Sequence, residues 1–319
     1  MVQLSAIDEE LLATIAELHG VPGGAYNIRR NGELIARAST PEIQVESKKD
    51  KPGINIFVAP GTKGKSVHIP VLLTVSGLKD VVYNTFDIGE DADVLVVAGC
   101  GIHNPGEEKS QHDGIHEFIL RRGARMRYVE RHYGQGPGTG ERVLNPKTIL
   151  ILEDGAQAEL ELVQISGVDG TVRETEATLA GRAHLVIRES VLTTGKQSAD
   201  SFISVELRGN GASTEVLARS VARGQSRQIF RARLTGRARA KGHVACDSLI
   251  MDQAEISSLP ELHAASPEAE LTHEAAIGRI AGEQLLKLMT LGLSEEEAVN
   301  TILAGFLGVN RALLAGSRS

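Results

Sequence analysis

Three side chains in the C-terminal part of the chain could bind a metal together, namely Cys246, His273 and Glu274. A thiolate, an imidazole and a carboxylate form a mixed ligand set, and thiolates suit iron–sulfur clusters and zinc. The segment between Cys246 and His273 is long enough to bring the two together. A permanent iron–sulfur cluster normally takes four Cys ligands, so a site with one thiol would hold a cluster weakly and could pass it on.

The stretch AELTHEAAIGRIAGEQL, which begins at Ala269, places a His-Glu pair before apolar residues at helical spacing. We therefore expect His273 and Glu274 to open a helix. A zinc protease signature requires a second His four residues after the first, and Ile277 stands there, so that type of site is excluded. Because the helix dipole also favours Glu near a helix N-terminus, a purely structural role for both residues stays open.

A second group of Cys and His residues lies in the single stretch CGIHNPGEEKSQHDGIHEF, which contains Cys100, His103, His112 and His116. Metal-binding proteins concentrate these residue types in this way. The spacing matches no standard zinc module, however, and the middle of the stretch is expected to be a loop. A zinc-binding protein that uses this group stays open as an alternative.

The stretch APGTKGKS, from Ala59 to Ser66, resembles a phosphate-binding P-loop in which Ala replaces the first Gly. A P-loop needs a helix directly after the Lys, because the helix N-terminus holds the phosphate. The following VHIPVLLTV is β-branched and predicts a strand. We expect a surface turn between two strands, and no ATP hydrolysis by this chain.

The composition excludes several classes of protein. The chain has 319 residues, a net charge of −7 and a pI near 5.8, so nothing indicates a nucleic-acid surface. No apolar run is long enough for a membrane span, and the N-terminus has no basic, apolar secretory signal, so we expect a cytoplasmic protein. Two Cys do not make a disulfide framework. The absence of Trp, with only 6 Phe and 4 Tyr, indicates a core of aliphatic side chains.

The middle of the chain has a recurrent pattern of Gly, Ala and a short run with alternating apolar residues. The glycines of this pattern recur at similar intervals and are Gly123, Gly155, Gly181, Gly211 and Gly236. Alternation predicts strands with one buried face, and units that cannot bury that face alone must stack. We therefore predict a mainly β fold with a β-solenoid core over residues 51–258, after a small helical and extended segment over residues 1–50. An antiparallel sandwich is the alternative, but it does not explain the scarcity of aromatic rings.

The two ends of the chain predict helices. Ile7 to Leu18 forms a short amphipathic pattern, and residues 259–319 are expected to be helical. In the latter region Gly292 ends one helix, and Ser294 with Glu297 forms a capping box for the next. The second helix of this hairpin carries Ala298, Ile302, Leu303 and Phe306. The hairpin could cap the solenoid, present a surface to a partner, or do both.

The C-terminal part resembles the SufB/SufD family of iron–sulfur cluster assembly scaffolds. The family pattern stands here in order: CDS, a Pro-Glu, HEA, GRI, a Gln-Leu pair, and GLSEEEA closed by Gly-Phe. SRQIFRARLTG is similar to the last coils of the family's solenoid, and the resemblance covers about residues 50–308. It implies a right-handed parallel β-helix with helical ends. It also implies a SufC-type ABC ATPase as partner, bound by the C-terminal hairpin around Ser294, Glu297, Ala298, Ile302 and Phe306.

The same resemblance implies roles for individual residues. Cys246 matches the scaffold Cys of the SufB type, Glu274 its second proposed ligand, and His273 the His that the SufD type contributes across the dimer. A homodimer could build two equivalent sites from these residues, and a heterodimer with a paralogue is the alternative. Cys100, His103 and His243 are further candidates for a secondary metal site or for the route that sulfur takes.

We therefore expect a scaffold for transient iron–sulfur clusters, not an enzyme, whose ATPase partner supplies the hydrolysis. A cysteine desulfurase or another donor would supply sulfur, and apo-proteins would receive the cluster. A structural SufD-like subunit without its own cluster is the first alternative, and a zinc-binding β-solenoid protein is the second. A polysaccharide-acting β-helix enzyme is disfavoured because the chain has no Trp for a sugar platform.

Overall fold

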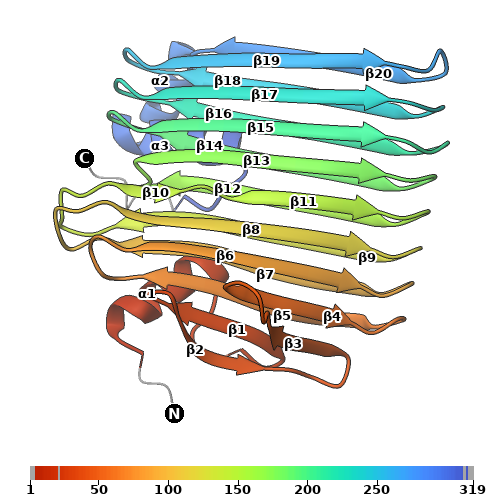
Figure 1. Cartoon of the computed structure of the whole chain (residues 1–319). Coiled ribbons are helices and arrows are strands. Elements are labelled where there is room, and N and C mark those ends of the chain that lie inside the picture. Colours follow the sequence, from red (N-terminus) through yellow and green to blue (C-terminus); the bar gives the residue numbers. More distant parts are fainter. Residues whose placement is uncertain (1–3, 21, 312–313, 315–319) are drawn as a thin grey trace.

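The computed structural model describes residues 4–20, 22–311 and 314 of the chain. Two β-sheets lie face to face, and from β4 onward the backbone crosses from one sheet to the other with almost every strand (Figure 1). Nearly all neighbouring strands within a sheet are parallel, which is the pairing of a solenoid and not of an antiparallel sandwich. The predicted mainly β solenoid fold is confirmed.

One sheet, called sheet A, contains the strands that face the helices. In spatial order they are β2 (Glu33–Ala38), β1 (Ala25–Arg30), β5 (Lys63–Leu73), β7 (Asp93–His103), β9 (Arg125–Gln135), β12 (Gln157–Ser166), β14 (His184–Thr193), β16 (Ser213–Ala222), β18 (Lys241–Ile250) and β20 (Glu270–Gly278).

The opposite sheet, called sheet B, runs the same way along the solenoid. Its strands, from the N-terminal end, are β3 (Ile43–Ser47), β4 (Gly53–Val58), β6 (Lys79–Ile88), β8 (Ser110–Leu120), β10 (Arg142–Leu144), β11 (Lys147–Leu152), β13 (Gly170–Leu179), β15 (Ser198–Leu207), β17 (Arg227–Gly236) and β19 (Glu255–Ala264). β10 and β11 together fill one position, because both pair with β8 and with β13.

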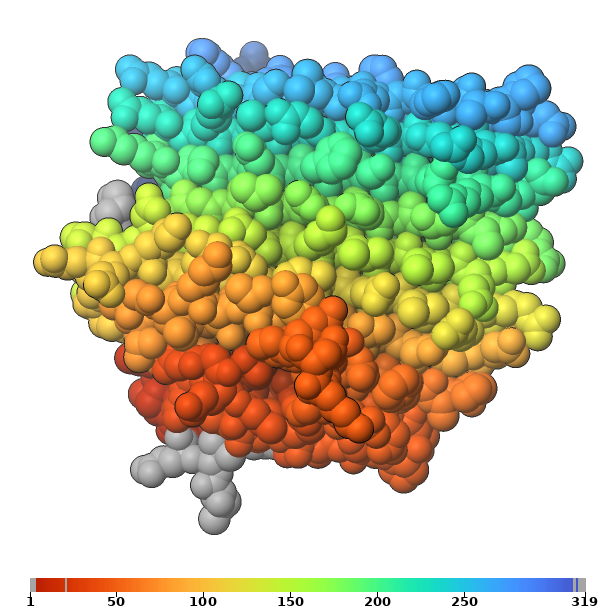
Figure 2. All heavy atoms as spheres, viewed as in Figure 1, coloured from red at the N-terminus to blue at the C-terminus, as the bar shows by residue number. Residues whose placement is uncertain are grey.

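Toward the C-terminal end, the coils of the two sheets repeat with one length. Ser213 pairs with Lys241 in sheet A, and Arg227 pairs with Glu255 in sheet B, so both sheets advance by the same number of residues per coil. This coil length agrees with the interval between the recurrent glycines of the sequence. Gly155 stands at such a corner with φ +71°, a left-handed conformation that favours glycine. The stacked coils form successive bands on the molecular surface, in sequence order from one end of the molecule to the other (Figure 2).

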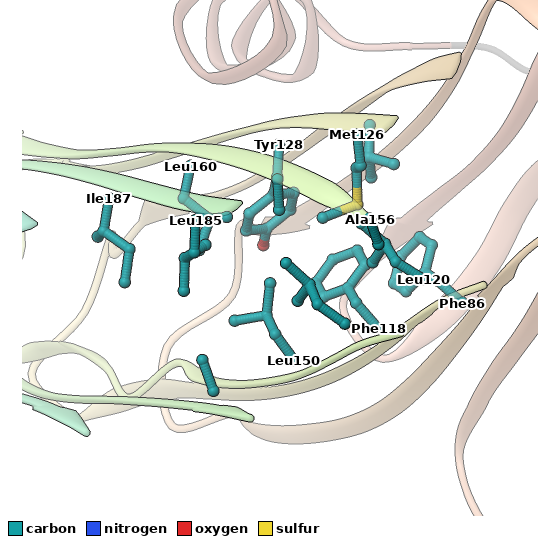
Figure 3. Packing of buried hydrophobic residues seen from close by; sticks show 14 of the residues in the cluster. Phe86, Phe118, Leu120, Met126, Tyr128, Leu150, Ala156, Leu160, Leu185 and Ile187 are labelled. Carbon is teal, nitrogen blue, oxygen red and sulfur yellow. The ribbon is translucent and has the colours of Figure 1, made fainter. Parts of the chain in front are cut away.

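The core is a set of aliphatic ladders between the two sheets. Its few aromatic rings gather near the middle of the solenoid, where Phe86 and Phe118 stack at 4.3 Å between ring centroids and Tyr128 packs on Phe118 at 4.8 Å. Figure 3 shows these rings between the two sheets, beside aliphatic side chains such as Leu150 and Leu160. The expected aliphatic core is therefore present, with one aromatic cluster that the pattern does not locate.

Helices cover parts of the outer face of sheet A. α1 (Ala6–Ala16) begins at a Ser5 capping box, packs on the N-terminal strands and ends near the predicted position. α2 (Gly282–Thr290) and α3 (Glu295–Leu307) follow the last strand, and Gly292 (φ +94°) and the Ser294 capping box separate them as predicted. In the described residues, no helix combines the length and the apolar character that crossing a membrane requires.

Two local predictions can be compared with the backbone. β5 begins at Lys63, so a strand and not a helix follows the P-loop-like turn, as expected. The prediction that His273 and Glu274 open a helix is wrong, because both lie in β20. The solenoid continues through β19 and β20 to Gly278, so strands occupy the first part of the region 259–319 that we expected to be helical.

Candidate functional site

Cys246 lies near the middle of β18, one strand from the C-terminal end of sheet A. Its neighbours Val244 and Ser248 share its phase along the strand, and all three are buried between the sheets. The thiol is only 2% exposed. The alternation of the strand thus places the predicted ligand inside the solenoid, one coil from its open end.

The surroundings of Cys246 are mostly apolar but include one unused hydroxyl. Burial raises the pKa of the Cys246 thiol, and the Ser258 hydroxyl on β19 opposes that rise. Ser258 Oγ is buried and has no hydrogen-bond partner within the described residues. It is therefore available to donate to the thiolate that forms when Cys246 binds a metal.

His273 and Glu274 occupy β20, the last strand of sheet A, and project to opposite faces. His273 pairs with Val244, so it shares the inner face with Cys246, and the two backbones lie about 8 Å apart by strand spacing. Glu274 pairs with Ala245 and lies on the outer face, where its Oε1 is 3.6 Å from His243 Nε2. The structure thus brings Cys246 and His273 to one face and separates Glu274 from them.

The open end of the solenoid exposes these last strands. β19 and β20 each have an unpaired edge in the described residues, and most side chains of β20 are exposed. Ile277, which shares the inner phase with His273, is 49% exposed, and Leu259 on β19 is 48% exposed. An edge of this kind is available for pairing with another chain.

Cys100 is also buried between the sheets, but far from Cys246. It lies on β7, pairs with His132 on β9 and is 1% exposed. Five strand steps of about 4.8 Å separate β7 from β18 in sheet A, or roughly 24 Å. Burial, then the charges of Asp80 and Glu130, raise the pKa of the Cys100 thiol well above its ordinary value.

Buried polar residues occupy much of the interior between the two thiols. We call them the interior polar column, whose members are Glu130, His132, Gln164, Arg173, Glu189 and Ser201. Arg173 on β13 forms an ion pair with Glu130 on β9, and its Nε lies 3.4 Å from Glu189 Oε2 on β14. Ser201 Oγ donates to the same Glu189 oxygen at 2.8 Å.

Burial and charge set the protonation of this column. Burial opposes ionisation of Glu130, but His132 and Arg173 outweigh it and lower the pKa of Glu130 to about 2. Burial lowers the pKa of His132 to about 3, so its ring is neutral at pH 7. Burial raises the pKa of Glu189, against the attraction of Arg173. None of these groups was predicted, although polar residues at inward positions of predicted strands are the signal that could have found them.

The second predicted group is only partly assembled. His112 and His116 both lie on β8 with inward side chains, and they line one small cavity together with Cys100. His103 ends β7, does not line that cavity, and has a buried Nδ1 without a partner in the described residues. Across the described ranges, no three His, Cys, Asp or Glu side chains already form a metal-binding group.

The C-terminal helices divide into a packed helix and an exposed one. On α3, Ala298 and Leu303 are fully buried, and Leu303 and Leu307 pack on the outer face of sheet A. Ile302 and Phe306 are partly buried, and Phe306 O accepts a hydrogen bond of 2.9 Å from Arg219. Ser294 and Glu297 cap the helix reciprocally.

By contrast, α2 buries no residue in the described structure. Its apolar side chains Leu286 and Met289 are 63% and 39% exposed, and Leu291 beside them is 79% exposed. These three residues, called the α2 apolar face, were not among the predicted partner-binding residues. Contiguous exposed apolar patches are a feature of protein–protein interaction sites.

Comparison with known proteins identifies the family. Residues 79–306 match the family model described as SUF system FeS cluster assembly, SufBD core domain. An iron–sulfur cluster assembly SufBD family protein of Methanothermobacter thermautotrophicus (strain Delta H) is 33% identical over 227 residues, which cover 69% of this chain and 53% of that protein.

Two other relatives align over more of the chain. SufBD family proteins of Archaeoglobus fulgidus and Methanocaldococcus jannaschii are 29% and 25% identical, covering 82% and 89% of this chain and 70% and 90% of their own lengths. The chain spans about half the length of its two Methanothermobacter relatives, 53% and 55%. Since the family model covers most of the chain and includes the strands that carry Cys100, Cys246 and His273, the chain belongs to the SufBD family of iron–sulfur cluster assembly proteins.

Proposed function

We propose that this chain is a scaffold on which an iron–sulfur cluster is assembled and from which it is transferred. The observation that carries the proposal is the position of Cys246, a buried thiol one coil from an open solenoid end, with His273 on the same inner face of the next strand. A site with a single thiol from each chain leaves a cluster with incomplete sulfur ligation. Such a cluster can leave the site, as a scaffold requires.

In this proposal Cys246 and His273 form the primary pair of ligands. The thiol must lose its proton when iron binds, and the Ser258 hydroxyl can stabilise the thiolate. Glu274 is held on the outer face by His243, so it joins the site only when β20 rearranges. We propose that this rearrangement accompanies pairing of two copies of the chain.

The open end is the surface that we propose for that pairing. The unpaired edges of β19 and β20 in the described structure and the exposed Leu259 and Ile277 support it. Two copies that meet there would place two Cys246 thiols close to one interface, and a two-fold axis would make the two sites equivalent. If a paralogue takes the place of the second copy, the two sites are no longer equivalent, because each combines residues of two different chains.

A SufC-type ABC ATPase is the proposed partner at the C-terminal helices. The α2 apolar face supports a docking surface there, next to the capped start of α3. Ala298 is fully buried, so its role in this proposal is to hold α3 in place and not to contact the partner. ATP-driven closure of the partner can act on the scaffold only if the two scaffold shapes differ in affinity for the partner's nucleotide states.

We also propose that sulfur enters at Cys100 and reaches Cys246 through the solenoid interior. Both thiols lie on the inner face of sheet A, and the interior polar column occupies much of the space between them. The charged and hydroxyl groups of the column provide hydrogen-bond partners for a polar sulfur species that an aliphatic core would not. A cysteine desulfurase or another sulfur donor would supply it.

Anaerobic reconstitution with iron and sulfide tests the ligands. The wild type is expected to take up iron and sulfide, and Cys246→Ala is expected to take up little, with His273→Ala and Glu274→Gln in between. Ser248→Ala serves as the matched control, because Ser248 is buried on the same face of β18 as Cys246 and carries no thiol. Equal uptake by wild type and Cys246→Ala would overturn the assignment. No uptake by the wild type would favour the structural SufD-like subunit.

A further inference from the structure

A small cavity lies inside the solenoid where β8 faces β7 and β9, and the proposed function gives it no role of its own. Its walls include Cys100, His112, Gly114 and His116. The cavity measures about 10 Å³, which is room for about one water molecule or one metal ion. Both His side chains are at least nine-tenths buried.

His112 is held with one ring nitrogen on a carboxylate. Its Nδ1 lies 3.0 Å from Asp80 Oδ2, and Arg29 holds the other oxygen of Asp80 at 3.2 Å. A carboxylate only accepts hydrogen bonds, so Nδ1 carries the proton. In the neutral form of the ring, the Nε2 of His112 is left with a free lone pair.

His116 is held in the same way through a tyrosine. The Tyr128 hydroxyl donates to the ionised Glu130 at 2.9 Å, so it must accept from His116 Nδ1, which lies 3.1 Å away. His116 Nδ1 therefore carries the proton of the neutral ring. Its Nε2 therefore also has a free lone pair.

The two free nitrogens converge on Gly114. A Cβ built on Gly114 would lie 3.2 Å from His112 Nε2 and 3.2 Å from His116 Nε2. No hydrogen bond joins either Nε2 to another group of the described residues. Two lone pairs that face one small space require a proton donor or a cation between them.

A third histidine of the cavity, His132, differs from His112 and His116 because it has no free ring nitrogen. His132 pairs with Cys100 in sheet A and also lines the cavity. Its Nδ1 accepts from Arg173 at 3.1 Å, and its Nε2 faces Glu130 Oε1 at 3.7 Å. Both of its nitrogens are therefore engaged, and it is not available as a ligand.

We propose that this cavity binds one divalent cation of the zinc or ferrous class, through His112 Nε2, His116 Nε2 and the Cys100 thiolate. Metal-binding His side chains characteristically donate their other N–H to a carboxylate or a similar acceptor, as His112 and His116 do. Imidazole and thiolate together select borderline cations over Mg²⁺ or Ca²⁺. No three donors are already in place in the described residues, so the Cys100 side chain turns toward the nitrogens and releases its proton to solvent when the cation binds.

An interruption of sheet B lies against the cavity, and we propose it as the way in for the cation. β10 ends at Leu144 and β11 begins at Lys147, and the residues between them, Asn145 and Pro146, line the same cavity. Pro has no N–H with which to continue the strand ladder. Asn145 N still donates to His112 O and Pro146 O still accepts from Glu174 N, so the bond missing from the wall is the one that the N–H of residue 146 would make.

Zinc binding by the chelator-treated full-length chain tests the proposal, by competition with a chromophoric chelator. One equivalent of Zn²⁺ is expected for the wild type and for Cys246→Ser. Affinity is expected to fall at least tenfold in His112→Gln, His116→Gln and Cys100→Ser. Co²⁺ added to the wild type should give a thiolate-to-cobalt absorption band that Cys100→Ser lacks. Fe²⁺ competition under anaerobic conditions then shows which cation binds more tightly.

Gly114→Ala keeps every ligand and places a methyl group in the cavity, so it should abolish binding while the chain stays folded by circular dichroism. The exposed His184→Gln is the matched control and should bind as the wild type does. The proposal is overturned if the wild type binds no zinc. It is also overturned if Gly114→Ala, His112→Gln and His116→Gln all bind zinc as the wild type does. Loss of zinc in Cys246→Ser alone would overturn it too, by assigning the cation to the cluster site. Cluster uptake at Cys246 is a separate readout, so the two proposals can fail independently.

Discussion

At the scale of single residues, the unusual feature is charge inside an aliphatic solenoid. Arg173 lies between Glu130 and Glu189, and all three are at most 3% exposed. Burying such a group is costly even when it is paired, and apolar side chains of similar volume are often no less stable. A contribution to stability alone therefore does not explain the interior polar column. Its position between Cys100 and Cys246 supports the proposed passage of a polar sulfur species.

Removal of Arg173 should reveal how much the fold depends on its pairing. Arg173→Met leaves two buried carboxylates without their cation, so the free energy of unfolding is expected to fall by about 3–5 kcal/mol. Arg233→Met is the matched control, because the Arg233–Glu261 pair is exposed and should contribute little. Urea unfolding of both variants measures the difference. Equal, small effects would mean that the column is hydrated or unpaired in solution.

Buried neutral histidine makes stability depend on pH. His132 has a folded pKa of about 3 against about 6.5 in an unfolded chain, so below pH 6.5 the unfolded state binds a proton that the folded state does not. Stability is therefore present above pH 6.5 and is lost as the pH falls toward 3. Urea midpoints of chelator-treated protein at pH 7, 5.5 and 4 should fall, and less steeply for His132→Gln. An identical slope for the two proteins would show that His132 is hydrated or charged in the folded state.

Part of this residue-level picture can be read from the sequence. Alternation within KGHVACDSLI places Cys246 inward with Val244, as the structure has it. The Glu130–Arg173 pair could not be foreseen, since it joins residues far apart in the sequence and depends on the register of coils of unequal length. The opposite faces of His273 and Glu274 follow at once from a strand, but not from the helix that we predicted.

At the scale of elements, local propensity fails where a neighbouring strand acts as a template. ELTHEAAIG is rich in helix formers, yet it forms β20 because β18 presents a complete parallel edge with inward apolar positions. The caps at Ser294 and Gly292 were predicted, since their hydrogen bonds lie within a few residues; the similar cap at Ser5 was not among the predictions. The divided role of the two C-terminal helices, with α3 packed and α2 exposed, depends on tertiary contacts that sequence patterns do not contain.

The exposed helix gives a direct test of partner docking. Leu286→Asp and Leu291→Asp are expected to weaken binding of a SufC-type ATPase at least tenfold, with no change in the thermal midpoint, because neither side chain is buried. Leu34→Asp is the matched control: Leu34 is 46% exposed but lies on β2, at the other end of the molecule. Calorimetric titration with the purified ATPase measures the affinities. Unchanged binding by both α2 variants would place the docking surface elsewhere.

At the scale of the whole molecule, the fold is a stack whose two ends differ in the direction of strand pairing. Antiparallel strands β2 and β3 end the two sheets at the N-terminal end, whereas parallel strands β20 and β19 end them at the C-terminal end, in the described residues (Figure 1). The coil repeat and the aliphatic core made the solenoid itself predictable. The open end was not predictable, because the last two strands were expected to be helical.

Pairing at the open end should depend on its apolar side chains. Ile277→Lys is expected to shift the protein from dimer toward monomer, because it places a charge where Ile277 lies on the inner phase of β20. Ile151→Lys is the matched control, at similar exposure on the outer face of β11, and should leave the mass unchanged. Sedimentation at several concentrations measures the equilibrium. A wild type that is monomeric throughout would contradict homodimer formation and would favour a paralogue as partner.

The claim that a site with one thiol per chain holds its cluster only transiently is tested most directly by transfer. Wild-type protein loaded anaerobically would be mixed with an apo-ferredoxin in the presence of an iron chelator, and the cluster on the ferredoxin would be followed by circular dichroism. We predict that the cluster moves to the ferredoxin faster than free iron and sulfide assemble there, and that Cys246→Ala carried through the same loading transfers none. A loaded wild type that keeps its cluster in the presence of the acceptor would contradict the scaffold function.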